Sequence, residues 1–272
     1  MLQSELEHFL LEDLGGGIYP EIIPANLTTG AIVIAEEPGT LAGIYEASQV
    51  FNHFDVEVVS MVGDGTSVEA GTTILEVSGP ANGILKSERL ALNFIGRMSG
   101  IATLTHQCKE LAGDVIVAGT RKTTPGFRKF EKKAIILGGG DPHRYNQSDT
   151  VMIKDNHIKL MGLEAAIANA KMVSGFTRKI EVEVENASDA VRAAELGVEI
   201  VMLDNRTPHE IREIVHILKK KGLREKIILE ASGGITPTNI EEYRETGVDV
   251  ISIGSLTHNA PWLDVSLTIT NE

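Results

Sequence analysis

The chain has 272 residues, a length that predicts one or two domains, and its 42% apolar and 23% charged residues are typical of a folded, water-soluble protein. A net charge of −13 argues against nucleic acid and anionic membranes as partners, and no apolar run approaches the ~18 residues of a spanning helix. The single cysteine, Cys108, excludes a disulfide framework, and an N-terminus without a basic signal-like region predicts a cytoplasmic protein.

The first part of the chain predicts one helix followed by a strand-rich segment. Ser4 and Glu7 have the spacing of a capping box, and the apolar residues that follow have helical spacing up to the glycines 15–17. Apolar runs bounded by glycines then predict three strands, with a short helix within 41–54 between the first two. The three runs are 31–35, 56–61 and 73–77.

A long helix is predicted next, from near Leu85 to near Ala112, and short apolar runs alternate with helices after it. Helix starts are indicated by Asn186, by the capping box that begins at Thr207, and by Thr236 before a proline. Strand–helix alternation predicts a parallel sheet with right-handed crossovers. The six apolar runs are 115–118, 151–153, 180–182, 200–203, 227–229 and 250–253.

Each of these six runs is followed by a polar or glycine-rich element, and this pattern favours a barrel over an open sheet. The strand ends of a βα barrel meet at one rim, whereas an open sheet concentrates function at one switch point. The segment 114–257 is shorter than the ~200 residues of a complete eight-stranded barrel. We therefore expect an α/β chain whose second half is an incomplete parallel α/β barrel of about seven strands.

The end of the chain predicts a return to the first domain. Apolar and polar residues alternate strictly over 263–269, which indicates a half-buried antiparallel strand rather than a barrel strand. The predicted domains are accordingly 1–112 with 259–272, which form an N-terminal α/β domain, and 113–258, which form the barrel.

One segment reverses the charge of the chain. Residues 121–159 carry a net charge of +5, while the remainder carries −18. A basic island in an acidic protein suggests a small, strongly anionic ligand. The alternative is a solvated helix face, which we expect for four of the cations because charge runs usually lie at the surface. These four are Arg128, Lys129, Lys132 and Lys133.

The polar residues at the strand ends differ along the barrel. Early ends are cationic, and two arginines suit two carboxylates or phosphates, although a surface salt bridge is the alternative for any one cation. Glu183 and Asp204 end adjacent strands and suit Mg²⁺, ribose hydroxyls or a developing cation, or else form a purely structural pair. The early cations are Arg121, Lys122, His143, Arg144 and Lys154.

Glycines mark the late strand ends. Ser232-Gly233-Gly234 and then Gly254-Ser255 resemble the phosphate site of late barrel strands. The chain has no Walker A loop, no GxGxxG that opens a helix and no HExxH motif. The residues alone therefore predict a barrel enzyme that acts on a polyanionic small molecule carrying a phosphate.

Several motifs together resemble one family, quinolinate phosphoribosyltransferase, from about Gly83 to the end of the chain. Its motifs are Ser87-Glu88-Arg89, Gly119-Thr120-Arg121-Lys122-Thr123-Thr124-Pro125-Gly126, Gly138-Gly139-Gly140 with His143-Arg144, Ile153-Lys154-Asp155-Asn156-His157, Glu181-Val182-Glu183, Leu203-Asp204-Asn205, Ala231-Ser232-Gly233-Gly234 and Gly254-Ser255-Leu256-Thr257-His258. The resemblance implies an N-terminal α/β sandwich plus a seven-stranded α/β barrel. It also implies decarboxylating phosphoribosyl transfer from phosphoribosyl pyrophosphate to quinolinate, which gives nicotinate mononucleotide for NAD synthesis.

The resemblance also implies site residues, a cofactor and partners. Quinolinate would be bound by Arg121, His143, Arg144 and Lys154. The protein would form a homodimer, or a larger oligomer built from it, in which Arg89 of one subunit reaches the quinolinate site of the other. The catalytic residues would be Glu183, Asp204, Lys122 and Lys154, with Glu183 and Asp204 also serving Mg²⁺. Phosphoribosyl pyrophosphate would be bound by Lys122, Glu183, Asp204, Ser232, Gly233, Gly234, Gly254 and His258. Thr120 and Ser255 would also bind substrate.

The implied reaction fits the charges of these residues. The segment 12–20 and two alternative functions stay open. The ring nitrogen of quinolinate would attack C1 of the ribose without a dedicated general base, because it has a free lone pair. The segment 12–20 lacks the family's Gly-Asp-x-Thr element. The alternatives are a paralogue with another acceptor, of the kind linked to molybdenum uptake, and a non-catalytic sensor of phosphosugars.

Overall fold

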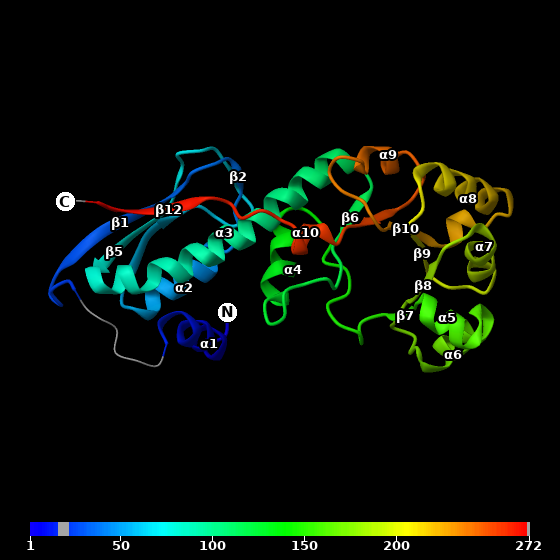
Figure 1. Ribbon diagram of the computed structural model, residues 1–272, viewed down its shortest axis with the longest axis horizontal. Coiled ribbons are helices and arrows are strands. Elements are labelled where there is room, and N and C mark those ends of the chain that lie inside the picture. The colour runs from blue at the N-terminus through cyan, green and yellow to red at the C-terminus, as the bar shows by residue number, and fades with distance from the viewer. Residues whose placement is uncertain (16–21, 271–272) are drawn as a thin grey trace. The chain divides into compact units, whose positions relative to one another are not determined.

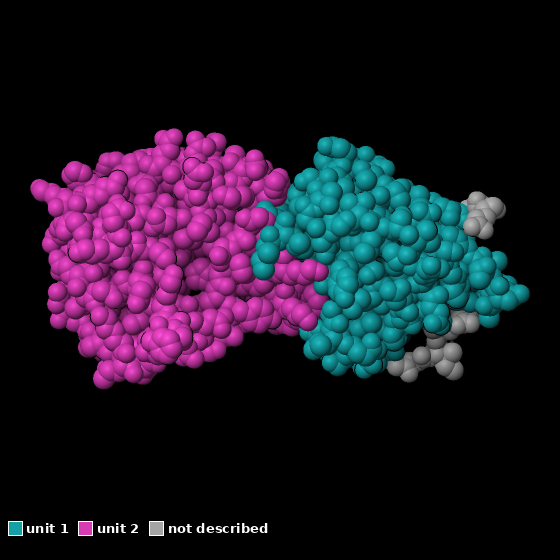
Figure 2. Space-filling model, turned by 180° about the vertical axis from the view of Figure 1, so that it is seen from behind, with its two compact units in different colours: residues 1–104, 136–138, 260–272 teal, residues 105–135, 139–259 magenta. Residues whose placement is uncertain are grey.

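The computed structural model describes residues 1–15 and 22–270, and the chain forms two compact units (Figures 1 and 2). The first unit comprises residues 1–104, 136–138 and 260–272, and the second comprises 105–135 and 139–259. The division falls inside helix α3 (Ala81–Ala112) rather than at its end. The domains 1–112 with 259–272 and 113–258 remain a prediction.

The first unit is built on a four-stranded antiparallel sheet in the order β12-β1-β5-β3. Its strands are β1 (Thr28–Ala35), β3 (Glu57–Met61), β5 (Thr73–Pro80) and β12 (Val265–Thr270), and a small pair joins β2 (Gly39–Thr40) to β4 (Ser67–Val68). Alternate residues of β1, such as Ala31 and Val33, are fully buried, as expected for a sheet covered on one face. The predicted return of the C-terminus is confirmed, because Ile269 pairs with Ala31.

The helices of this unit are α1 (Gln3–Leu14), α2 (Ile44–His53) and the first part of α3. The predicted capping box of Ser4 and Glu7 is wrong. Helix α1 starts two residues earlier, with Leu2 at the N-cap, and the Glu5 carboxylate accepts a hydrogen bond from the Leu2 N–H at 2.7 Å. Ser4 therefore lies inside the first turn. Most of the unusual segment 12–20 lies outside the described residues.

One glycine of α3 lets the C-terminal tail cross the helix closely. A Cβ at Gly100 would collide with the Pro261 carbonyl, so no larger residue fits without displacing the tail. One turn before, at Gly96, the helix carbonyl accepts the Leu263 N–H at 2.9 Å. These contacts lead the chain from the tail into β12.

The second unit contains a six-stranded parallel sheet in the order β6-β11-β10-β9-β8-β7. Its strands are β6 (Ile116–Ala118), β7 (Val151–Ile153), β8 (Ile180–Val184), β9 (Ile200–Asp204), β10 (Ile228–Ser232) and β11 (Val250–Ser252). Within the described residues β6 and β7 form the two ends of this order, so the barrel is incomplete, as predicted. The seventh position is a single parallel bridge between Ala118 and Asp141, beside β6. All six predicted apolar runs are strands of this sheet.

The helices after α3 are α4 (Arg128–Leu137), α5 (Asp155–Met161), α6 (Leu163–Val173), α7 (Ala187–Glu195), α8 (Pro208–Lys220), α9 (Ile240–Arg244) and α10 (Ser255–His258), with the 3₁₀ turn η1 (Arg224–Lys226). Helices α5 to α9 lie along the outer side of this sheet, as Figure 1 shows, whereas α10 contributes residues to the pocket described below. None of the helices in the described ranges has the length and apolarity that crossing a membrane requires. Cys108 is buried in α3, and burial raises the pKa of its thiol to about 11.

Two of the three predicted helix starts in this unit are confirmed. The Asn186 side chain accepts a hydrogen bond from the Asp189 N–H at 2.9 Å, and Thr207 and Glu210 form the predicted capping box. The start at Thr236 is wrong, because α9 begins at Ile240. Thr236 instead donates its N–H to the Asn239 side chain at 2.8 Å and closes a turn before the helix.

Candidate active site

A pocket of about 630 Å³ lies at the carboxyl ends of the strands in the second unit. Parallel strands bring their carboxyl ends to one rim, which explains why residues far apart in the sequence meet here. Every predicted site residue of the barrel lines this pocket: Thr120, Arg121, Lys122, His143, Arg144, Lys154, Glu183, Asp204, Ser232, Gly233, Gly234, Gly254, Ser255 and His258. Arg89 does not line it and is exposed on α3 in the other unit.

The loop after β6 presents Arg121 and Lys122 and is held at two points. The buried carboxylate of Glu131 accepts hydrogen bonds from the Thr124 N–H and hydroxyl, both at 3.0 Å. The Thr257 hydroxyl donates to the Lys122 carbonyl at 2.6 Å. The Nε of Arg121 is buried and has no hydrogen-bond partner. A held loop with an unsatisfied guanidinium suits a planar anion.

The glycine-rich loop that follows α4 positions His143 and Arg144. A Cβ at Gly140 would lie 2.7 Å from the Thr105 side chain and 3.1 Å from the Val117 carbonyl, so the loop packs too closely for any larger residue. Lys132 donates a short hydrogen bond to the carbonyl of Pro142 in this loop.

Lys132 overturns part of the predicted solvated helix face. Its side chain is only 3% exposed, whereas Lys129 on the same helix is exposed. Burial, followed by the charge of Arg128, lowers the pKa of Lys132 to about 8. The sequence suggested a surface charge because four cations lie close together, but the turn of α4 points this one inward.

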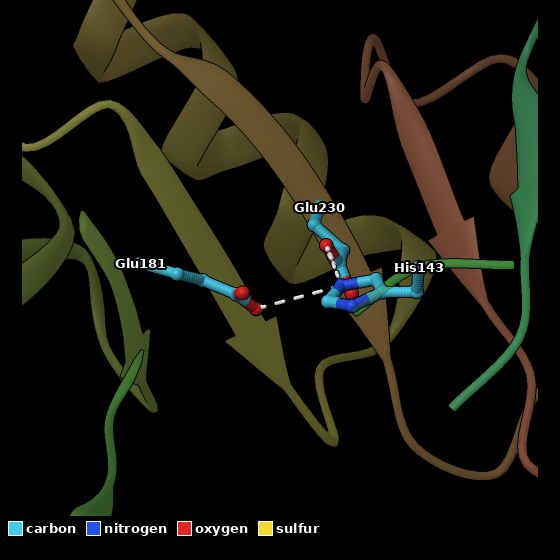
Figure 3. Close-up of side chains that lie close together, drawn as sticks. All are labelled: His143, Glu181 and Glu230. Carbon is cyan, nitrogen blue, oxygen red and sulfur yellow. Dashed lines mark hydrogen bonds and ion pairs between the residues drawn. The ribbon is translucent and has the colours of Figure 1, made fainter. Parts of the chain in front are cut away.

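His143 lies between Glu181 of β8 and Glu230 of β10, two strands that β9 separates in the sheet (Figure 3). Its Nε2 is 3.3 Å from a Glu230 carboxylate oxygen and 3.8 Å from a Glu181 oxygen. Its Nδ1 accepts the Arg144 N–H at 2.7 Å, so the neutral ring carries its proton on Nε2 and donates it to Glu230. Its φ of 53° is unusual for a residue other than glycine and marks local strain at the site.

The same three side chains have the composition of a metal site, since one ligand atom of each lies within 4.8 Å of the others. A metal would need the lone pair of Nε2 and a proton on Nδ1 that donates to an acceptor. Here Nδ1 faces the N–H donor of Arg144 instead. The cluster is therefore better suited to sharing protons than to holding a metal.

The two glutamates of this cluster were missed by the sequence analysis. Glu181 is fully buried, and neither of its carboxylate oxygens has a hydrogen-bond partner. Burial, followed by the charge of Glu230, raises the pKa of Glu181 to about 7. Burial alone lowers the pKa of His143, but the hydrogen bond and charge of Glu230, with the charge of Glu181, raise it above its usual value. A signal was present, because an acid inside an apolar strand run is unusual.

Two other acids lie at the rim of the pocket and are hydrogen-bonded. Glu183 at the end of β8 pairs with the Lys154 Nζ at 2.7 Å, and Asp204 at the end of β9 accepts a hydrogen bond from the Asn205 side chain at 2.7 Å. Carboxylate oxygens are the ligands that Mg²⁺ prefers, and substrate phosphates commonly complete its coordination. These two residues therefore fit a magnesium ion that enters with a phosphorylated substrate.

Two glycine segments form the remaining part of the lining. Gly233 has a φ of +99°, and a Cβ there would collide with the Asn205 side chain. Gly254 approaches Lys122 closely, since a Cβ would lie 3.0 Å from its Cδ. The hydroxyl of Ser255 is buried without a partner. Exposed backbone and free hydroxyls of this kind can approach a phosphate group.

Two family models match the chain. "Quinolinate phosphoribosyl transferase, C-terminal domain" matches residues 101–268, and the corresponding N-terminal domain matches residues 18–99. The chain belongs to the quinolinate phosphoribosyltransferase family. The alignments extend over nearly the whole length of the relatives, so the family relation covers both units rather than the barrel alone.

Individual relatives agree with this assignment. The chain is 46% identical to a protein of Archaeoglobus fulgidus named "probable nicotinate-nucleotide pyrophosphorylase (carboxylating)", over 88% of this chain and 93% of the relative. It is 39% identical to the nicotinate-nucleotide pyrophosphorylase (carboxylating) of Rattus norvegicus, over 97% and 89%. The crystal structure of NadC from Streptococcus pyogenes has 38% identity and a TM-score of 0.91, over 98% and 96%. This likeness confirms the predicted fold class, an N-terminal α/β domain plus an incomplete barrel.

Proposed function

We propose that this chain is a nicotinate-nucleotide pyrophosphorylase (carboxylating), which makes nicotinate mononucleotide, pyrophosphate and CO₂ from quinolinate and phosphoribosyl pyrophosphate in NAD synthesis. Two relatives that align with 88% and 97% of this chain carry this name, the first of them as probable. The observation that carries the proposal for the chain itself is the lining of one pocket. That lining combines cations, two rim acids and two glycine segments in one pocket.

Quinolinate is a dianion, and the cations of the pocket lining suit it. Arg121, His143, Arg144 and Lys154 bind its two carboxylates in this proposal, supported by their common place in the pocket. Guanidinium groups hold carboxylates bidentately and fix the ring in one orientation. A bound carboxylate also gives the buried Nε of Arg121 the partner that it lacks.

In this proposal phosphoribosyl pyrophosphate occupies the rest of the same pocket, supported by the common place of its binding residues in the lining. Its pyrophosphate is bound by Thr120 and Lys122, and its 5′-phosphate by Ser232, Gly233, Gly234, Gly254, Ser255 and His258. Glu183 and Asp204 bind the ribose hydroxyls and Mg²⁺. When bound, Mg²⁺ neutralises charge on the departing pyrophosphate.

The chemistry needs positioning and charge more than proton transfer. The ring nitrogen of quinolinate, held beside C1 of the ribose, forms the new bond as the bond from C1 to pyrophosphate breaks. Glu183 and Asp204 stabilise the positive charge that develops on the ribose, and Lys122 stabilises the leaving group. The pyridinium formed then accepts the electron pair of the breaking carbon–carboxylate bond, CO₂ leaves, and the ring carbon takes up a proton.

A homodimer is part of the same proposal. Arg89 is exposed on α3 and outside the described pocket, and the partner subunit's Arg89 would complete the quinolinate site. Replacing it by alanine would then raise the KM for quinolinate without unfolding the unit. A cytoplasmic location also belongs to this proposal.

The test is a reaction of the purified protein with quinolinate, phosphoribosyl pyrophosphate and Mg²⁺, followed by mass spectrometry of nicotinate mononucleotide. Product should require all three components and fall ~100-fold or more in Arg121→Ala, which removes a bidentate charge-assisted contact. Lys129→Ala, an exposed cation on α4, is the matched control. A folded protein that binds phosphoribosyl pyrophosphate but forms no product would indicate another acceptor base.

A further inference from the structure

The side chains of Glu181, His143 and Glu230 do not satisfy one another's hydrogen-bonding groups in the described structure. Three of the four carboxylate oxygens are buried without a hydrogen-bond partner, and the fourth accepts the single proton of His143. On the other side of the ring, Nδ1 uses the Arg144 N–H at 2.7 Å. That N–H and the ring are consequently turned toward each other rather than toward a ligand.

Adding a proton to Nδ1 would change both groups at once. The ring would become a cation with two donors, and Nδ1 could no longer accept from Arg144. The Arg144 N–H and the Nδ1–H would then both be free to donate. Two adjacent donors in a pocket that His143 and Arg144 both line suit an incoming carboxylate.

We propose that Glu230 is a positioning residue that holds the Nε2 proton of His143, so that quinolinate binds with uptake of a second proton at Nδ1. The inference rests on the proposed function, which places His143 at the quinolinate carboxylates. On binding, one proton moves from solvent to Nδ1 and the Arg144–His143 hydrogen bond breaks. Two hydrogen bonds to the carboxylate form in its place. Glu230 acts through its contact with His143 at 3.3 Å.

The groups that face the His143 ring include both acids and cations, and their combined effect favours protonation of Nδ1. Glu230 on β10 and Glu181 on β8 approach Nε2 at 3.3 and 3.8 Å and stabilise a cation. Lys132 on α4 and the Arg144 N–H oppose it. Asp141, in the same loop, accepts the backbone N–H of His143 at 2.6 Å and fixes the main chain. The raised pKa of His143 agrees with this balance.

The test compares wild type with Glu230→Gln, a variant that keeps the shape of the side chain and an acceptor oxygen but loses the charge. The KM for quinolinate is measured from pH 6 to 9, and the KM for phosphoribosyl pyrophosphate is measured beside it. In wild type the KM for quinolinate should rise about tenfold per pH unit above the His143 pKa. In Glu230→Gln the rise should begin at lower pH, with the KM for phosphoribosyl pyrophosphate unchanged.

A loss of packing alone would not move a pH break, which separates this role from a structural one. Glu185→Gln, at an exposed position after β8, controls for the loss of one negative charge. Glu230→Ala removes the acceptor as well and should raise the KM for quinolinate roughly tenfold more than Glu230→Gln, as expected for a lost hydrogen bond to a charged group. An identical pH break in wild type and Glu230→Gln would overturn the inference.

A second measurement separates this inference from the proposed function. The titration of ¹⁵N-labelled His143 is followed by NMR in the unliganded protein, where no substrate is needed. A lower midpoint in Glu230→Gln supports the positioning role, and an unchanged midpoint contradicts it. If His143→Ala leaves the KM for quinolinate unchanged, the assignment of His143 to quinolinate fails instead.

Discussion

Strand β8 carries two glutamates on one face, and their surroundings differ sharply. Glu183 lies at the pocket rim and pairs with Lys154 at 2.7 Å, whereas Glu181, two residues earlier, is fully buried with neither oxygen hydrogen-bonded. Residues two apart in a strand point the same way but are separated by ~7 Å along it. That distance leaves the Glu181 carboxyl buried and without a hydrogen bond to the rim cations. Depth along a strand therefore decides whether an acid can act as a charge or must take up a proton.

The rim acids are the place where a substitution should have the largest effect. Asp204→Asn keeps the side-chain shape and removes the charge that faces the ribose and Mg²⁺ in our proposal. We expect kcat to fall ~100-fold or more, as for the loss of a preorganised electrostatic group, while the free energy of unfolding changes by less than ~1 kcal/mol. Steady-state kinetics and urea denaturation measure the two quantities.

Glu183→Gln should behave in the same way, and Asp155→Asn provides the control. Asp155 pairs with Lys159 on α5 outside the pocket, so its loss should leave kcat unchanged. Wild-type turnover in both Asp204→Asn and Glu183→Gln would show that the rim acids have no catalytic role. The rim acids would then differ from the buried Glu181 only in their exposure to water and not in function.

The buried glutamate should give the opposite result, a gain in stability that depends on pH. The pKa of Glu181 is about 7 in the folded chain, against 4.5 for the ordinary side chain. Between these values the folded chain holds a proton that the unfolded chain has lost, so the free energy of unfolding falls as pH rises. Above pH 7 the cost of the buried charge is complete. Glu181→Gln avoids it and should be more stable than wild type by ~2 kcal/mol at pH 8.

Urea denaturation at pH 5 and pH 8 checks this expectation. At pH 5 wild-type Glu181 is protonated when folded, so the advantage of Glu181→Gln should largely disappear. Glu185→Gln, an exposed acid beyond the same strand, should show no such pH dependence. An equal stability difference at both pH values would mean that Glu181 is ionised in the folded chain throughout.

The same difference in depth explains what the sequence predicts well. Rim residues such as Glu183 and Asp204 follow apolar runs, and the ends of parallel strands must meet, so their place in one pocket follows from the pattern. Glu181 lies inside the run 180–182, which predicted only a strand. The alternation of a strand puts Glu181 on the face of Glu183, but its partner Glu230 comes from a strand not adjacent to β8. Only the folded sheet, with β9 between β8 and β10, brings the two side chains together at His143.

The wrong predictions of two helix starts and of one exposed lysine have a common origin. In each case a neighbouring residue or the packing of the helix competes with the predicted role. Ser4 and Thr236 are good N-cap residues, yet Glu5 reaches back to Leu2, and Asn239 captures the N–H of Thr236. Lys132 belongs to a run of cations that suggested solvent, but α4 packs that side chain inward. In each case the residue type fits the predicted role, and a nearby residue or the packing of the helix decides otherwise.

The smallest effect on stability is expected from the rim ion pair itself. Lys154 is half-exposed, and its pair with Glu183 is screened by water, so Lys154→Met should change the free energy of unfolding by less than ~1 kcal/mol. The KM for quinolinate should nevertheless rise about tenfold, because a cation beside a bound carboxylate is lost. Lys159→Met removes a pair of the same 2.7 Å length on α5 and is the matched control. Equal effects of the two variants on the KM for quinolinate would show that Lys154 acts only as the partner of Glu183.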